Sequence, residues 1–204
     1  MYPSAKFVIP DWITEEIGHP ETGNPTPTYT DLNARMDLVI QLAERNIREG
    51  GGPFGAAVFE IDSGKLVAPG VNRVVPSHSS LAHAEAMAIA VAQQVLQSHD
   101  LGAPELPAME LVTSAQPCIQ CYGILWWSGL RRLVIGANHD DVESLTGFQE
   151  GPLPRNWADK LEHRPPLPPI QVIRDVRRQE ARRVLRNYRE AGGIVYNPGA
   201  DAAR

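Results

Sequence analysis

Two small groups of metal-ligating side chains, 35 residues apart, constrain the fold of this chain more than any other feature. The first group is His83 with Glu85, and the second is Cys118 with Cys121. Zinc prefers nitrogen and sulfur ligands in a tetrahedron, and a catalytic zinc site takes three side chains and leaves the fourth position for water. His83, Cys118 and Cys121 meet that count, so a fold that uses them must bring two distant segments together.

Each group lies at the beginning of a predicted helix. Cys118 and Cys121 are three residues apart and therefore share one face of a helix that begins near Pro117. The free N–H groups and the positive end of the helix dipole there favour thiolate over thiol. His83 and Glu85 are two residues apart, which separates their side chains by about 200° around a helix. This divergence suits a metal ligand at His83 and an unliganded carboxylate beside the metal at Glu85.

Two other kinds of site also use a Cys-x-x-Cys pair. A thioredoxin-like redox pair is one, but the chain has no Trp-Cys-Gly-Pro-Cys pattern, and that function would leave His83 and Glu85 unexplained. A structural zinc site is the other, and it needs a fourth ligand. His78, His99 and His139 are the candidates for that fourth position. A non-catalytic zinc module is disfavoured because a structural site has no use for the carboxylate of Glu85.

Apolar periodicity divides the chain into alternating helices and strands. Because these elements alternate after an opening hairpin, they predict a three-layer α/β/α sandwich with a mixed five-stranded sheet. The predicted helices cover about residues 32–47, 82–97, 117–127, 155–163 and 175–191, and the predicted strands cover 56–61, 66–75, 110–114, 133–137 and 170–173.

The first 28 residues differ from the rest in their proline content. A high density of proline resists regular structure, so we expect residues 1–28 to form an irregular arm and residues 29–204 to form a single domain. The five prolines of this arm are Pro3, Pro10, Pro20, Pro25 and Pro27.

Charge and hydropathy exclude some classes of protein. The chain has 19 Lys and Arg against 24 Asp and Glu, a net charge of −5, which argues against a general nucleic-acid binder. The counter-signal is residues 174–190, where seven arginines stand against three acidic residues. No apolar run reaches the roughly 18 residues that span a bilayer, and the amino-terminal stretch makes a poor signal peptide. We therefore expect a cytoplasmic protein that binds no membrane.

The spacing His-x-Glu followed by Pro-Cys-x-x-Cys is the signature of zinc deaminases. Over about residues 30–197 the chain resembles the cytidine-deaminase-like zinc hydrolases, and within them the bacterial guanine deaminases. The guanine-deaminase resemblance is carried by the stretches GGPFG at 51–55, NRV at 72–74 and GFQEGP at 147–152. Gln116 and Gln120 depart from the family pattern, which usually has Glu and Met at these positions.

The resemblance implies a cytidine-deaminase-like fold and a Zn²⁺ cofactor bound by His83, Cys118 and Cys121. It implies that Glu85 moves protons during the reaction and that Glu150 is a second acidic group at the leaving amine. Judged by its position alone, Glu150 would equally be a solvated loop carboxylate. The implied reaction is the hydrolysis of guanine to xanthine and ammonia.

The resemblance also implies residues that bind the small-molecule nucleobase. Asn72 would hydrogen-bond the purine, although an Asn there also suits a bond to nearby backbone. Phe54 either stacks on the base or belongs to the core. The chain around Tyr196 and Asn197 would cover the site, and members are commonly homodimers. Two alternative functions stay open, a tRNA adenosine deaminase and a deaminase of another free base or an aminotriazine.

Overall fold

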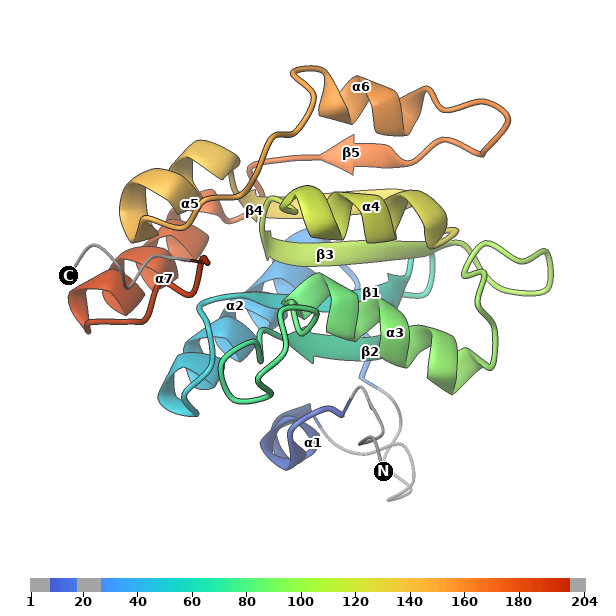
Figure 1. Cartoon of the computed structure of the whole chain (residues 1–204). Coiled ribbons are helices and arrows are strands. Elements are labelled where there is room, and N and C mark those ends of the chain that lie inside the picture. Colours follow the sequence, from blue (N-terminus) through green and yellow to red (C-terminus); the bar gives the residue numbers. More distant parts are fainter. Residues whose placement is uncertain (1–7, 18–26, 199–204) are drawn as a thin grey trace, which may run out of the picture.

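The computed structural model describes residues 8–17 and 27–198. Its centre is a mixed five-stranded sheet with the strand order β2-β1-β3-β4-β5 (Figure 1). β1 runs antiparallel to both β2 and β3, whereas β3, β4 and β5 run parallel. The predicted sheet is therefore confirmed. The strands are β1 (Gly55–Glu60), β2 (Leu66–Val71), β3 (Met109–Ala115), β4 (Arg132–Ala137) and β5 (Gln171–Ile173).

Helices cover both faces of the sheet, which gives the three predicted layers. On one face, α2 (Leu32–Arg48) and α7 (Arg178–Glu190) enclose one apolar core, and on the other α3 (Ala84–Leu96) and α4 (Ile119–Trp127) enclose a second (Figure 1). α2 begins where the carboxylate of Asp31 accepts a hydrogen bond from Ala34 N at 3.0 Å. No described helix has the length and apolar content needed to cross a membrane.

Three further helices complete the structure: α1 (Asp11–Ile17), α5 (His139–Thr146) and α6 (Trp157–Glu162). α5 is absent from the sequence prediction because its polar sequence gives little apolar periodicity. It is held instead by Asp141, a buried carboxylate that accepts hydrogen bonds from Asn138 N and from the arginines Arg178 and Arg182 of α7. Charge pairing between helices replaces the apolar stripe on which the prediction relied.

The prediction of an irregular amino-terminal arm is wrong for residues 11–17. Pro10 precedes α1 and does not interrupt it, because a helix tolerates proline where its backbone N–H needs no partner. Trp12 and Ile13 are buried in the core that α2 also lines, so this segment packs on the domain. Residues 1–7 and 18–26 of the predicted arm lie outside the described residues.

The sheet topology brings three loop positions to one edge. β2 and β3 run in the same direction because each is antiparallel to β1, so their carboxyl ends lie at the edge where β1 begins. Gly55 pairs with Val71, and Ala56 pairs with Thr113. The residue before β1, the residue after β2 and the segment after β3 therefore meet along this edge.

The sheet also contains a fully buried carboxylate at Glu110 on β3. One carboxylate oxygen contacts the guanidinium of Arg35 on α2, and the other accepts a hydrogen bond from Arg132 Nε on β4 at 2.5 Å. Arg35 also donates to the carbonyls of Tyr29 and Ile61 at 2.8 and 3.0 Å. Each buried charge thus has an opposite charge beside it, as a buried ion requires.

We expect Glu110→Gln to lower the free energy of unfolding by about 3 kcal/mol, because it leaves buried arginine charge without its partner. Urea denaturation measures the change. Glu60→Gln on β1 is the matched control, since its pair with Lys65 spans 3.9 Å at the surface and its loss costs less than about 1 kcal/mol. Equal effects of the two substitutions would contradict a special role for the buried carboxylate.

Candidate active site

The side chains of His83, Cys118 and Cys121 converge on one point. His83 Nδ1 lies 3.4 Å from Cys118 Sγ and 3.5 Å from Cys121 Sγ, and all three ligand atoms lie within 4.8 Å of one another. Zinc with bonds of about 2.3 Å to sulfur and about 2.0 Å to nitrogen has tetrahedral S···N edges of about 3.6 Å. The donor set therefore fits a zinc ion both in chemistry and in spacing.

This convergence follows from the position of each ligand at a helix start. His83 is the N-cap of α3, and Cys118 is the N-cap of α4, directly after β3. In both residues the cap position leaves the side chain free, because neither makes a side-chain cap hydrogen bond. Cys121 lies in the first turn of α4 and is buried. Both predicted helices are present, and each begins two residues later than expected, at Ala84 and at Ile119.

The two cysteines have opposite proton affinities. A hydrogen bond from Cys121 lowers the pKa of Cys118 to about 4, despite the opposing effect of burial. The same hydrogen bond, with burial, raises the pKa of Cys121 well above that of an ordinary thiol. The pair therefore holds one proton near neutral pH, and a metal that binds both sulfurs must displace it.

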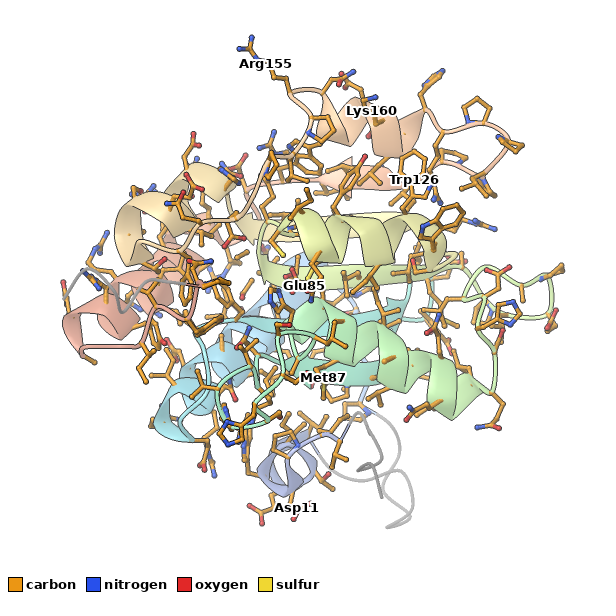
Figure 2. All side chains as sticks on the ribbon, viewed as in Figure 1. Asp11, Glu85, Met87, Trp126, Arg155 and Lys160 are labelled. Carbon is orange, nitrogen blue, oxygen red and sulfur yellow. The ribbon has the colours of Figure 1, made fainter. Side chains whose placement is uncertain are left out.

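Glu85 lies in the first turn of α3 and is 7% exposed. In Figure 2 its side chain lies at the centre of the molecule, between the amino-terminal ends of α3 and α4. Burial, and then the negative charge of Cys118, raises the pKa of Glu85 to about 7. A carboxyl group with this pKa exchanges a proton readily at neutral pH, which suits a general acid and base.

Glu150 is the second carboxylate of the site. Its backbone carbonyl accepts a hydrogen bond from Ile119 N at 3.0 Å, which attaches the 147–152 loop to the start of α4. Burial raises the pKa of Glu150 to about 8, with further contributions from Cys118 and Glu85. This environment is not that of a solvated loop carboxylate, the alternative that the sequence left open.

A cavity of about 320 Å³ joins these groups to the predicted base-binding residues. Asn72, directly after β2, is 1% exposed and lines the cavity. Phe54, directly before β1, also lines it, and its ring centroid lies 5.5 Å from that of Phe148. Backbone bonding of the Asn72 amide is slight, a contact from Val74 N to Oδ1 at 3.4 Å.

The carboxyl-terminal segment reaches the same cavity. The side-chain amide of Asn197 accepts from Gln149 N at 2.8 Å and donates to Gln149 O at 3.1 Å, so it ties this segment to the 147–152 loop. The Tyr196 ring packs against Phe148, with centroids 4.5 Å apart. The hydroxyl group of Tyr196 is buried and has no hydrogen-bond partner among the described residues. Tyr196 and Asn197 both line the cavity.

Several residues considered at the sequence level lie elsewhere. Among the described residues, the group of side chains that can hold a metal is limited to His83, Cys118 and Cys121, so the three other histidines supply no fourth ligand. Trp127 is 75% exposed, and neither it nor Trp126 lines the cavity. Gln116 and Gln120, the two departures from the family pattern, both line it.

Sequence reasoning missed two residues of this region. Phe148 is buried beside Phe54 and Tyr196, and the resemblance covered its stretch without singling it out. Asn46 of α2 is fully buried and bonded to the loops before β1 and after β2. The available signal for Asn46 was a polar residue on the apolar face of a predicted helix, three and four residues after Ala43 and Leu42.

Comparisons with known proteins agree with this geometry. A guanine deaminase of Bacillus subtilis (strain 168) is 34% identical over 116 residues, which cover 56% of this chain and 69% of that protein. A solved structure of guanine deaminase from Nitrosomonas europaea has 44% sequence identity and a TM-score of 0.84, covering 93% of this chain and 98% of that one. Another solved structure, a complex with 2,6-diaminopurine, has 46% identity and a TM-score of 0.83, covering 93% and 95%.

The family model for the cytidine and deoxycytidylate deaminase zinc-binding region matches residues 30–137. This match spans more than half of the chain and includes His83, Cys118 and Cys121. The predicted fold class, the zinc cofactor and the assignment as a zinc-dependent hydrolase are confirmed. The chain therefore belongs to the family of zinc-dependent cytidine and deoxycytidylate deaminases.

Proposed function

We propose that this enzyme hydrolyses guanine to xanthine and ammonia. The observation that carries the proposal is a single cavity lined by metal ligands, by the buried carboxylate of Glu85, by the half-buried carboxylate of Glu150 and by groups suited to a flat aminated ring. The groups suited to such a ring are the amide of Asn72 and the rings of Phe54 and Phe148. Relatives from Bacillus subtilis and Nitrosomonas europaea are described as guanine deaminases, and the similarity to the second covers nearly its whole length.

In this proposal, His83, Cys118 and Cys121 would hold a zinc ion, which would lower the pKa of a water from about 15.7 to about 7 and so would supply hydroxide at neutral pH. Glu85 accepts the proton that the water loses and passes it to a ring nitrogen of guanine. Protonation makes the neighbouring amino-bearing carbon electrophilic, and the water oxygen bonds to that carbon. Burial raises the pKa of Glu85 to about 7 in the metal-free protein, which suits a group that first accepts a proton and then delivers it.

The C–N bond to the amino group then breaks as the amine takes up a proton from Glu150 and leaves as ammonia. The new hydroxyl on the same carbon gives its proton to Glu85 and becomes the carbonyl of xanthine, and transfer of that proton through solvent to Glu150 restores both carboxyl groups. Glu150 holds that proton at neutral pH, since its pKa is about 8. Asn72 offers both a donor and an acceptor to the purine edge. Phe54 packs against the ring, while Tyr196 and Asn197 cover the bound base and exclude water.

The arginine-rich helix α7 offers little support for the alternative function on tRNA. Arg178 and Arg182 contact Asp141 on α5, and Arg177 bonds to Asp37 of α2 at 2.8 Å. Arg183 lies 3.6 Å from Glu44 of α2. These arginines neutralise carboxylates of the same domain, so they are poorly placed to release counterions from an RNA backbone.

We also propose that the enzyme is a homodimer in the cytoplasm. The chain has only two cysteines, and both are assigned to the metal, so its fold needs no disulfide and suits a reducing compartment. Four large apolar side chains on α3, on α4 or in the loop before α3 are exposed, and exposed apolar side chains of this size are typical of surfaces that bind another protein. These are Leu81, Val95, Ile119 and Trp127, with exposures of 58%, 61%, 47% and 75%.

Substitution of the carboxylates tests the reaction. We expect Glu85→Gln to lower kcat with guanine by about 10²- to 10⁴-fold, because an amide cannot move the proton. Glu150→Gln should also lower kcat, by about tenfold or more, with KM little changed. Xanthine formation measures both, and zinc content is checked in each variant. Glu60→Gln serves as the control, and wild-type turnover in Glu150→Gln would remove that residue from the mechanism.

Zinc affinity should fall as the pH falls. Cys121 is protonated in the free protein because its pKa is raised, and zinc displaces that proton, so acid favours the metal-free form. The dissociation constant should therefore rise by at least about tenfold for each unit between pH 8 and pH 6. The rise should be steeper toward pH 6, because, against the opposing effect of burial, the contact with Cys118 raises the pKa of His83, so that His83 must lose a proton as well. Competition with a chromophoric chelator measures it. An affinity that stays constant over this range would show that no proton is released.

Trp127→Ser should weaken the dimer. Buried tryptophans at the centre of an interface commonly contribute 2 kcal/mol or more, so we expect the dimer dissociation constant to rise by about 30-fold or more. Sedimentation equilibrium measures it. Ile194→Ser, which changes an apolar residue with 53% exposure beyond α7, is the control. A monomeric wild type, or equal effects of both variants, would refute this interface.

A further inference from the structure

Asn46 joins the two loops that carry the proposed base-binding residues. Its Nδ2 donates to Gly52 O at 2.8 Å, in the loop that leads to Phe54. The same Nδ2 donates to Asn72 O at 2.7 Å. Asn46 is fully buried, and no part of it lines the cavity. Any effect it has on the substrate must therefore act through the loops.

The chemistry of these contacts requires an amide. The two hydrogens of Nδ2 serve two backbone carbonyls, and Oδ1 accepts from Arg73 Nη1 at 3.1 Å. A flipped amide would set its oxygen against two carbonyl oxygens and its NH₂ against a guanidinium, so the orientation is fixed. A carboxylate in the same place would keep the contact to Arg73 but would repel both carbonyls.

The two loops are closely packed, so their positions depend on the hydrogen bonds from the Asn46 amide. Gly52 N donates to Asn72 O at 3.2 Å, and Asn72 N donates to Phe54 O at 3.1 Å, so the loops are bonded to each other as well. A Cβ on Gly51 would lie 2.3 Å from Asn46 Nδ2. A Cβ on Gly52 would lie 2.7 Å from Asn72 Oδ1. The glycines allow approaches that any side chain would prevent.

We propose that Asn46 is a positioning residue for recognition of the base. The side-chain amide of Asn46 on α2 holds the backbone carbonyl of Asn72. It thereby fixes the backbone position from which the Asn72 side chain enters the cavity. This inference rests on the proposed function, in which Asn72 binds the substrate. The class of ligand affected is a planar aminated base bound through a donor and acceptor pair.

The test is a double-mutant cycle between Asn46→Asp and Asn72→Ala. Asn46→Asp alone should lower kcat/KM for guanine by about 10- to 100-fold, mostly through a higher KM, because ground-state binding is lost. In the Asn72→Ala background it should change kcat/KM by less than about twofold, since two residues that act as one unit are not additive. Titration with xanthine, which is not consumed, should show the same pattern in the dissociation constant.

Two further variants separate positioning from stability. The added Cβ in Gly51→Ala would clash with the side-chain amide of Asn46 and should raise KM in the same way. This variant keeps the test valid if Asn46→Asp does not fold. Leu38→Ala removes a buried side chain of the same helix, away from the loops. It should lower Tm and leave KM unchanged, and zinc content should stay constant throughout.

An unchanged KM in both Asn46→Asp and Gly51→Ala, or an equal effect with and without the Asn72 side chain, would overturn the inference. Failure of the proposed function has a different result, namely a wild type that does not deaminate guanine. In that case the cycle is run with the base that the wild type does deaminate. The effect of Asn46→Asp on kcat/KM, compared with and without the Asn72 side chain, then tests the role of Asn46 whichever base is the substrate.

Discussion

The site depends on the meeting of two helix starts over one edge of a sheet. β3 ends where β1 begins, and its loop places Cys118 at the start of α4, while α3 begins with His83 against the same edge. A helix start offers free N–H groups and a positive dipole end, which favour the anionic form of the Cys118 sulfur. The expected thiolate is not found at Cys121, where the hydrogen bond to Cys118 and burial raise the pKa. Two of the metal ligands come from cap positions and the third from a first turn, so no regular helix has to be distorted to aim them.

The same edge explains why the two carboxylates have raised pKa values. Burial and the negative charge of Cys118 raise the pKa of both Glu85 and Glu150, and the charge of Glu85 raises that of Glu150 further. In the proposed reaction Glu85 must accept and return a proton near neutral pH and Glu150 must deliver one, so the burial that raises their pKa values serves the chemistry. The domain tolerates this cost because its other buried carboxylates, Glu110 and Asp141, each face two arginines.

The sequence was most informative where chemistry depends on spacing. The ligand set and the neighbouring Glu85 follow from residue types and intervals of two and three, because a helix start fixes how such residues diverge. The five strands and the layers follow from alternating apolar periodicity. Asn72 and Glu150 came from the resemblance instead, since a single Asn or Glu in a loop has no periodic pattern around it.

What the sequence did not reveal depends on contacts between distant segments. α5 is held by the pairing of Asp141 with α7, and α1 is held by burial of Trp12 and Ile13, neither of which has a local pattern. Asn46 reads as an unremarkable interruption of an apolar helix face until Gly52 and Asn72 are seen to meet it. The polar contacts that order the cavity are tertiary, whereas the ligands are local.

The order of these parts along the chain has a consequence for variation. All three ligands occur within the first 121 residues, whereas Glu150 and the Tyr196–Asn197 segment come from the remaining part. Phe54 and Asn72 lie in the same stretch as the ligands, so only part of the handling of the base is encoded in a stretch of the polypeptide that carries no ligand to the ion. Changes late in the chain can alter which molecule is accepted while leaving every ligand to the ion in place, so new specificities can arise without rebuilding the reactive centre.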